Sequence, residues 1–215
     1  GGVEERSGAV NLHVDGDFLI EIPVKQSGLY MDMTESRFDF ESGAASRTVS
    51  MSTNLSFWNV LEKPSWVSVS PESGEAGEHT LTINVEDNPN TTKREGRVVV
   101  GNQGLSLADT LWVTQEGKSF GPLETVLQFE NVASSNTLDI STDGDWTVTT
   151  SDGWITVAPS SGHGNGQVTV TVEANETDNE RTGLLSVAVG GTVQYVNVVQ
   201  KGRYFTIDRG PSASL

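Results

Sequence analysis

The sequence contains one internal repeat, and this repeat limits what the chain can fold into. Trp66 and Pro71 recur as Trp154 and Pro159, each 88 positions later. The other recurring pairs, at spacings that shrink from 88 to 85 residues, are Trp58 with Trp146, Gly74 with Gly162, Asn88 with Asn175, Arg94 with Arg181, and Gln115 with Gln200. A period of this length is too long for a solenoid unit and fits a whole small domain. The chain is therefore predicted to contain two copies of one module in tandem.

Both copies consist of short stretches in which apolar and polar residues alternate. In the second copy Val168, Val170 and Val172 fall on one side of such a stretch, and Gly190-Gly191 provides a hairpin turn. No helical period persists, and turn residues separate the stretches at intervals of about 8–12 residues. In the first copy the predicted strands are Thr48–Ser52, Phe57–Leu61, Trp66–Ser70, Thr80–Val85, Gly96–Val100 and Leu107–Thr114. The predicted fold class is all-β, with two tandem immunoglobulin-like antiparallel β-sandwiches and a short N-terminal β segment.

The predicted domain boundaries follow the repeat: an N-terminal β segment (1–35), two sandwiches (36–118 and 119–203) and a tail (204–215). The first segment is too short for a core of its own, so we expect it to dock on the first module or to pair with a sheet edge. Its hairpin turn is predicted at Asp15-Gly16-Asp17, and Tyr204–Asp208 alternates like one more strand. Phe120 and Leu123 predict a stiff junction with apolar contact between the modules.

Composition excludes several classes of function. The chain has no cysteine, which removes disulfides and thiolate chemistry, and its formal net charge of −16 disfavours nucleic acid and anionic lipid as partners. No apolar run approaches the roughly 20 residues of a membrane span, so we expect no membrane insertion. We also expect the chain to be a monomer. The chain opens with Gly1-Gly2, and we expect targeting information to have been removed. Its Gly-, Ser-, Thr- and Val-rich make-up is typical of an exported β-protein.

The ordered set of recurring residues resembles BACON domains (Bacteroidetes-associated carbohydrate-binding, often N-terminal). The residues that carry the resemblance are Trp66 to Gly74 with Trp154 to Gly162, Asn88 and Arg94 with Asn175 and Arg181, and Gln115-Glu116-Gly117 with Gln200-Lys201-Gly202. The resemblance covers roughly residues 36–118 and 127–202. It implies immunoglobulin-like sandwiches on exported or surface-anchored proteins that handle polysaccharides.

The tryptophans are the candidate ligand residues, because flat aromatic faces stack on sugar rings. Trp58 and Trp146 are predicted to belong to the core, since a sandwich of this size normally holds a buried tryptophan. Trp66 and Trp154 are predicted at a sheet margin, either packed or in contact with a ligand. Trp112 aligns with the polar Asn197 of the second copy, so it is predicted to point outward, either against a neighbouring segment or toward a glycan. The predicted ligand-binding residues are therefore Trp112, Trp66 and Trp154.

No pattern of residues indicates catalysis, a metal or a cofactor. His13, His79 and His163 do not form a cluster in the sequence, and no serine-nucleophile elbow occurs. The acidic turns are explained by turn chemistry, because no segment has the ligand spacing of a calcium loop. The recurring Asn and Arg residues are predicted to cap a turn and to bind a nearby carboxylate or carbonyl.

The sequence thus predicts a non-catalytic exported module at the cell surface or in the periplasm. Its expected role is that of a rigid spacer or an interaction and adhesion scaffold in a glycan-utilisation context, as part of an anchored lipoprotein. The alternative is direct carbohydrate binding through exposed aromatic residues. A polysaccharide or a surface protein is the expected partner.

Overall fold

The computed structural model describes residues 4–204 and divides into two compact units. The first unit holds residues up to Asn88 together with Lys93–Glu116, and the second holds Pro89–Thr92 and the chain from Gly117 onward. The predicted all-β fold class is confirmed, since the one helical element of the described residues is a 3-10 turn, η1 (Gln103–Leu105). None of the described helical elements is long and apolar enough to cross a membrane.

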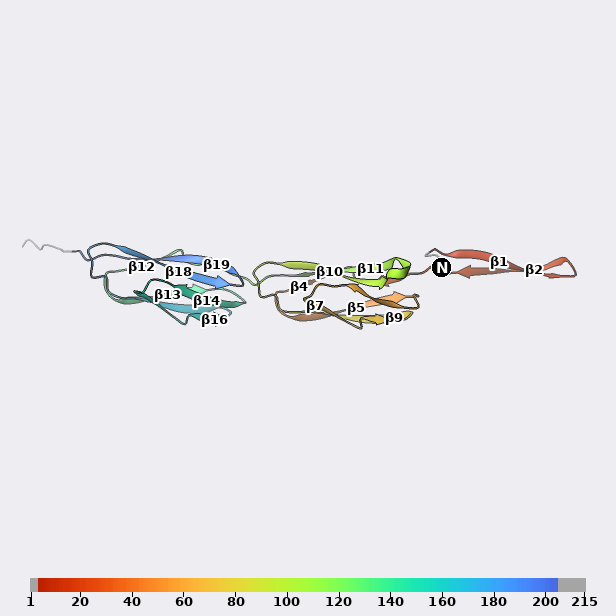
Figure 1. Cartoon of the computed structure of the whole chain (residues 1–215), viewed down its shortest axis with the longest axis horizontal. Coiled ribbons are helices and arrows are strands. Elements are labelled where there is room, and N and C mark those ends of the chain that lie inside the picture. Colours follow the sequence, from red (N-terminus) through yellow and green to blue (C-terminus); the bar gives the residue numbers. More distant parts are fainter. Residues whose placement is uncertain (1–3, 205–215) are drawn as a thin grey trace, which may run out of the picture. The chain divides into compact units, whose positions relative to one another are not determined.

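The first unit is a sandwich of two sheets, stacked as two layers (Figure 1). The strand orders are β3-β5-β9-β7 in one sheet and β4-β11-β10-β6-β8 in the other. The strands are β3 (Met31–Met33), β4 (Arg37–Phe40), β5 (Ala45–Thr53), β6 (Trp58–Glu62), β7 (Val67–Ser70), β8 (Ser73–Gly74), β9 (Gly77–Val85), β10 (Arg94–Asn102) and β11 (Leu107–Gln115).

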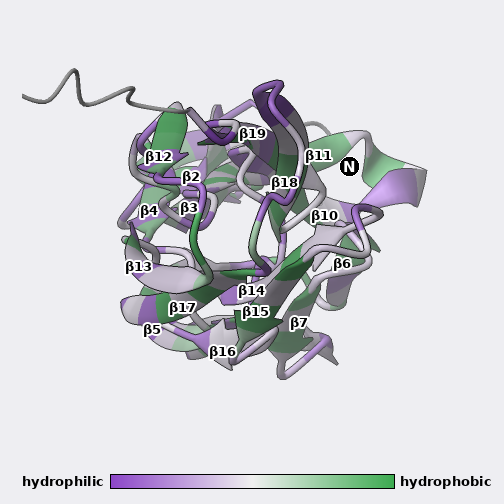
Figure 2. Ribbon diagram, turned by 90° about the vertical axis from the view of Figure 1, so that its left-hand side faces the viewer, coloured by the Kyte–Doolittle hydropathy of each residue, from purple (hydrophilic) through white to green (hydrophobic). Residues whose placement is uncertain are grey.

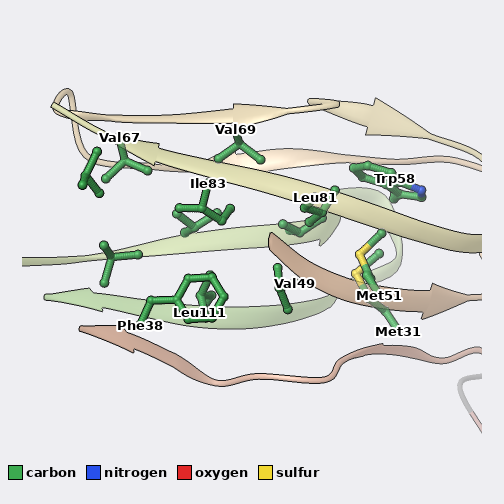
Figure 3. Packing of buried hydrophobic residues seen from close by; sticks show 14 of the residues in the cluster. Met31, Phe38, Val49, Met51, Trp58, Val67, Val69, Leu81, Ile83 and Leu111 are labelled. Carbon is green, nitrogen blue, oxygen red and sulfur yellow. The ribbon is translucent and has the colours of Figure 1, made fainter. Parts of the chain in front are cut away.

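The core of this unit lies between its two sheets. Alternate residues of each strand point inward, so that Leu81 and Ile83 of β9 face Leu111 of β11 across the sandwich (Figure 3). Trp58 is fully buried at one end of this core. Apolar and polar residues accordingly alternate along the ribbons (Figure 2), which is the pattern from which the strands were predicted.

The second unit repeats this arrangement with one strand fewer in its smaller sheet. The orders are β13-β17-β15 and β12-β19-β18-β14-β16. The strands are β12 (Val126–Phe129), β13 (Ser134–Ile140), β14 (Asp145–Thr150), β15 (Ile155–Ala158), β16 (Ser161–His163), β17 (Gly166–Val172), β18 (Arg181–Val189) and β19 (Thr192–Gln200). The predicted turn between β18 and β19 is confirmed, because Gly190 and Gly191 both take the positive φ that a tight hairpin turn requires.

The prediction of purely antiparallel sheets is wrong for one pair of strands in each unit. β4 runs parallel to β11, and β12 runs parallel to β19. Both are four-residue strands that join the first and last parts of a module. The sequence does not reveal them, because four residues are too few for a clear alternation and because pairing between distant segments involves no local turn signal.

The N-terminal segment divides into a separate hairpin and a strand of the sandwich. β1 (Arg6–Val14) and β2 (Asp17–Gln26) pair as predicted around a tight turn, but every residue of both strands is exposed. For this hairpin the expected docking on the first module stays a prediction, whereas the alternative, pairing with a sheet edge, is confirmed for β3. Only β3 joins the sandwich, because it pairs with β5 at the sheet edge and buries Met31.

The apolar residues of the predicted junction are used inside the second unit. Phe120 bridges to Thr142 in the same way that Met31 pairs with Thr53 in the first unit, 89 positions earlier. Phe120 and Leu123 both pack on the core of the second unit. The second sandwich thus completes its edge with a single bridging residue where the first uses a strand. The predicted strand at Tyr204–Asp208 lies, apart from Tyr204, outside the described residues.

Candidate functional site

The residues shared by the two modules meet in a buried polar cluster, which we call the glutamine clamp. In the first unit its centre is Gln115, which is fully buried at the end of β11. Its Nε2 group donates to the backbone carbonyls of Ser42, Gly43 and Glu86 at 2.9–3.1 Å. Its Oε1 accepts from Nε and Nη2 of Arg94 at 2.9 and 2.7 Å. One side chain thereby joins the loop after β4, the end of β9 and the start of β10.

The second unit contains the same clamp around Gln200 at the end of β19. This side chain is also fully buried, and its Nε2 donates to the carbonyls of Glu130, Val132 and Glu173 at 3.0–3.3 Å. Its Oε1 accepts from Nε of Arg181 at 2.9 Å, and Nη2 of Arg181 binds the Glu173 carbonyl at 2.7 Å. The two networks connect equivalent strands, so the same side chains hold the same parts of the sandwich together in both units.

Each clamp arginine also covers a tryptophan. The guanidinium of Arg94 lies 4.5 Å above the centre of the Trp66 ring, and that of Arg181 lies 4.2 Å above Trp154. Partial burial lowers the pKa of Arg94, although an arginine stays charged in any case. Both indoles are half-buried and pack on the core of their own unit. The faces that a sugar would need are therefore occupied, and Trp66 and Trp154 do not form an exposed row.

The asparagines of the repeat hold the long connection before β10 and before β18. The Nδ2 group of Asn88 donates to the carbonyl of Glu116 at 2.9 Å, and that of Asn175 donates to the carbonyls of Asn179 and Lys201 at 2.8 and 3.0 Å. Both asparagines are buried. The prediction that the recurring Asn and Arg residues fix this connection through backbone carbonyls agrees with these contacts.

Each of the two core tryptophans packs against a glycine, Trp58 against Gly74 and Trp146 against Gly162. Trp58 and Trp146 are buried, and their Nε1 groups donate to loop carbonyls at 3.1 and 2.9 Å. A methyl group on Gly74 would come within 2.8 Å of the Trp58 ring, and one on Gly162 would overlap the Trp146 ring. The recurring Trp–Gly pairs are thus close contacts that only glycine permits, and the prediction that Trp58 and Trp146 form core is confirmed.

Trp112 occupies a different environment, on the outer face of the larger sheet of the first unit. Its strand neighbours Leu111 and Val113 are fully buried, while Trp112 is 46% exposed, as the comparison of the repeats predicted. Across the sheet it pairs with Arg97 of β10 on one side and Arg37 of β4 on the other. We call these three residues the Trp112 row. No described residue places a guanidinium over this indole, unlike the indoles at the two clamps.

Both arginines of the Trp112 row are paired with carboxylates. Arg97 binds Glu62 in a two-point contact at 2.8 Å, and Arg37 binds Asp39 at 2.9 Å and the hydroxyl of Thr114 at 2.6 Å. The hydrogen bond from Arg37 holds the pKa of Asp39 below its usual value, and the one from Arg97 does the same for the pKa of Glu62. The carboxylates of Asp39 and Glu62 thus balance the charge of the two arginines in the Trp112 row and add hydrogen-bond acceptors beside it.

The second unit has an aliphatic surface at the equivalent place. Asn197 takes the position of Trp112 and pairs with Leu184 and Val126, which are exposed at 42% and 41%. Tyr195, two residues before Asn197, is exposed at 59%. The sequence analysis missed Tyr195, although the alternation of β19 and the exposure predicted for Asn197 would have placed it on the same outer face.

The histidines His79 and His163 and the turn residue Asp143 make local structural contacts. Nε2 of His79 donates to the carbonyl of Glu75 at 2.8 Å, and its ring packs edge-on against Trp58, while His163 binds Asp145 at 2.8 Å. Asp143 accepts the hydroxyl hydrogen bond of Ser119 at 2.8 Å within its turn. In the part of the chain that the structure covers, no three metal-binding side chains gather at one place.

A hollow of about 170 Å³ lies beside the Glu130–Lys201 ion pair. Its volume is smaller than the roughly 300 Å³ or more of typical ligand pockets.

The comparison with protein families agrees with this division into two like units. Residues 56–116 match the BACON family, described as a putative binding domain, N-terminal, and residues 122–203 match the viral BACON domain family. The chain contains two tandem BACON-type domains. BACON-type domains are non-catalytic binding or spacer modules, and the resemblance predicted from the recurring residues is confirmed.

Among characterised proteins, the chain is similar to part of a Bacteroides ovatus xyloglucan-specific endo-β-1,4-glucanase, with 32% identity over 78 residues. That match covers 36% of this chain and 16% of the glucanase. The structure of a Bacteroides ovatus GH5 xyloglucanase in complex with a XXXG heptasaccharide matches at 30% identity and a TM-score of 0.38, over 40% of this chain and 19% of that one. A titin fragment, I67–I69, matches at 9% identity and a TM-score of 0.32, over 81% of this chain and 65% of that one.

Proposed function

We propose that this chain is a non-catalytic scaffold of a glycan-handling protein, in which two rigid BACON-type domains space or present other parts. The observation that supports this most strongly is the duplication of the glutamine clamp. In both units the shared glutamine and asparagine side chains are buried, and their amide nitrogens donate to backbone carbonyls of the same unit. Side chains used in this way stabilise a domain and leave nothing free for chemistry.

The setting that we propose is an exported protein held at the cell surface, as a lipoprotein, where the chain is a monomer that contacts a polysaccharide or a surface protein. Similarity to part of a xyloglucanase supports the glycan context. The formal net charge of −16 suits a module that stays soluble and does not adhere to anionic surfaces. An adhesion role belongs to the same proposal, since a spacer and an adhesin both need rigid domains.

Small-angle scattering tests the spacer role. We expect a narrow distribution of shapes for the chain in solution, because a spacer must hold its two ends a fixed distance apart. A variant with a Gly/Ser insertion between Lys118 and Ser119 is the control, and its distribution should be broader. A wild-type distribution as broad as that of the insertion variant would remove the spacer role.

Direct carbohydrate binding is the second candidate function, and it depends on one surface. Trp66 and Trp154 are covered by Arg94 and Arg181, so they do not support it. Trp112 supports it, because its indole is exposed beside hydrogen-bonding side chains.

A further inference from the structure

We propose that the Trp112 row, with the carboxylates of Asp39 and Glu62, is a binding surface for an uncharged, hydroxyl-rich polysaccharide. Trp112 is the stacking platform, and the ion pairs Arg37–Asp39 and Arg97–Glu62 are the hydrogen-bonding flanks. The inference rests on the second candidate function and names its residues and ligand class. It is independent of the spacer role, which concerns the rigidity of the chain.

The geometry forms a continuous strip across neighbouring strands. Trp112 of β11 is in register with Arg97 of β10 and with Arg37 of β4. Because neighbouring strands lie about 4.7–4.9 Å apart, the three side chains span about 10 Å at right angles to the strands. Glu62 of β6, bound to Arg97, extends the strip in the same direction. An extended chain molecule, rather than a compact small molecule in a pocket, fits such an open strip.

The fold does not require a tryptophan at this position. The equivalent residue of the second unit is Asn197, in the same register of an equivalent sheet. Leu111 and Val113 supply the inward side chains of β11, so the indole adds nothing to the core. The tryptophans that do serve the fold are buried or lie under an arginine. Trp112 therefore differs from the other four tryptophans in that it lies on the outer face and does not pack in the core.

The flanking side chains favour a sugar over a protein surface. Protein interfaces are enriched in tryptophan and arginine but depleted of Asp and Glu, whereas both guanidiniums beside Trp112 hold a carboxylate. Guanidiniums only donate hydrogen bonds and carboxylates only accept them, so each pair offers both roles side by side. A sugar hydroxyl also donates and accepts, and the C–H face of a sugar ring suits the electron-rich face of an indole.

The charge balance favours a neutral glycan over an acidic one. Asp39 and Glu62 have lowered pKa values and stay ionised, so a uronate or sulfate group would have to displace a carboxylate from its arginine. The net charge of −16 also repels a polyanion as it approaches. A neutral polysaccharide meets neither obstacle.

Affinity gel electrophoresis and calorimetry with defined polysaccharides test this proposal. The probes are three neutral polymers (xyloglucan, mixed-linkage β-glucan and galactomannan) and two acidic ones (polygalacturonate and alginate). We expect the wild-type chain to bind at least one neutral polymer and neither acidic one. Trp112→Ala should weaken that binding by about fivefold or more, since stacking on an aromatic side chain is worth at least about that factor in comparable recognition.

Two further variants separate the ligand site from an effect on folding. Asn197→Ala, at the matched position of the second unit, should bind as the wild type does. Glu62→Gln should weaken binding while the melting temperature stays unchanged, because Glu62 is exposed on the surface. The proposal is overturned if no neutral polymer binds, if Trp112→Ala binds as well as the wild type, or if the acidic polymers are preferred. The scattering result has no bearing on any of these outcomes.

Discussion

The two units have nearly the same interior and different outer faces. Inside, Gln115 and Gln200 make the same contacts to equivalent strands, and each clamp arginine covers a tryptophan. Outside, the first unit presents Trp112 between ion pairs, and the second presents Asn197 between aliphatic side chains. Residues that two copies of a module share are those that the fold requires, whereas an unshared surface residue is free to serve another purpose.

The most severe test of this comparison removes the glutamine clamp. Gln115→Ala or Gln200→Ala removes the donor that several backbone carbonyls share and one acceptor of the clamp arginine, and each buried polar group left unsatisfied costs about 1–3 kcal/mol. We expect the free energy of unfolding of the affected unit to fall by about 3 kcal/mol or more in either case, as measured by urea denaturation. The exposed residues Gln103 and Gln128 are the matched controls, and their alanine variants should unfold as the wild type does. A large loss in only one unit would show that the two clamps are not equivalent.

A smaller effect is expected at the glycines that contact the core tryptophans. Gly162→Ala puts a methyl group into the Trp146 ring, and Gly74→Ala does the same less severely at Trp58. Overpacking of this kind costs about 1–3 kcal/mol, so both variants should melt at lower temperature, Gly162→Ala more so. Gly43→Ala and Gly153→Ala, whose added methyl groups meet no neighbour, are the controls. Equal melting temperatures for all four variants would contradict the close Trp–Gly packing.

The smallest effect concerns pH and only the first unit. The pKa values of Asp39 and Glu62 are lowered from those of free carboxyl groups, because each carboxylate accepts a hydrogen bond from an arginine. A lowered pKa means that the ion pair persists above that value and is lost as the pH falls through it. Polysaccharide binding should thus be constant from about pH 8 to pH 5 and weaken only below about pH 4. Calorimetry across this range checks it, and a loss of binding near pH 6 would point to other groups.

Much of the fold was predictable from the sequence because it depends on local patterns. The alternation in β9, β11 and β17 and the turn glycines Gly190 and Gly191 place most strands and one hairpin without any tertiary information. The parallel strands β4 and β12 were missed, because their partners lie at the far end of each module. The docking of the hairpin β1–β2 stays a prediction, since a local pattern predicts the hairpin itself and not the surface that would cover it.

The candidate site was predictable only in part. Comparing the two copies identified Trp112 as outward-facing, since its counterpart is polar. The flanking residues Arg37, Arg97 and Glu62 could not be found in this way, because their relation to Trp112 depends on the register of β4, β10 and β11. Trp66 and Trp154 were candidates because the sequence does not reveal that Arg94 and Arg181 cover their rings.

The central claim is that the recurring tryptophans build the fold and that Trp112 alone contacts ligand. An NMR titration with a neutral polysaccharide that the chain binds tests this directly, because each of the five tryptophans gives its own indole N–H signal. The account predicts that the Trp112 signal moves or broadens with added polysaccharide while those of Trp58, Trp66, Trp146 and Trp154 stay in place. A response at Trp66 or Trp154 with an unchanged Trp112 signal would contradict it.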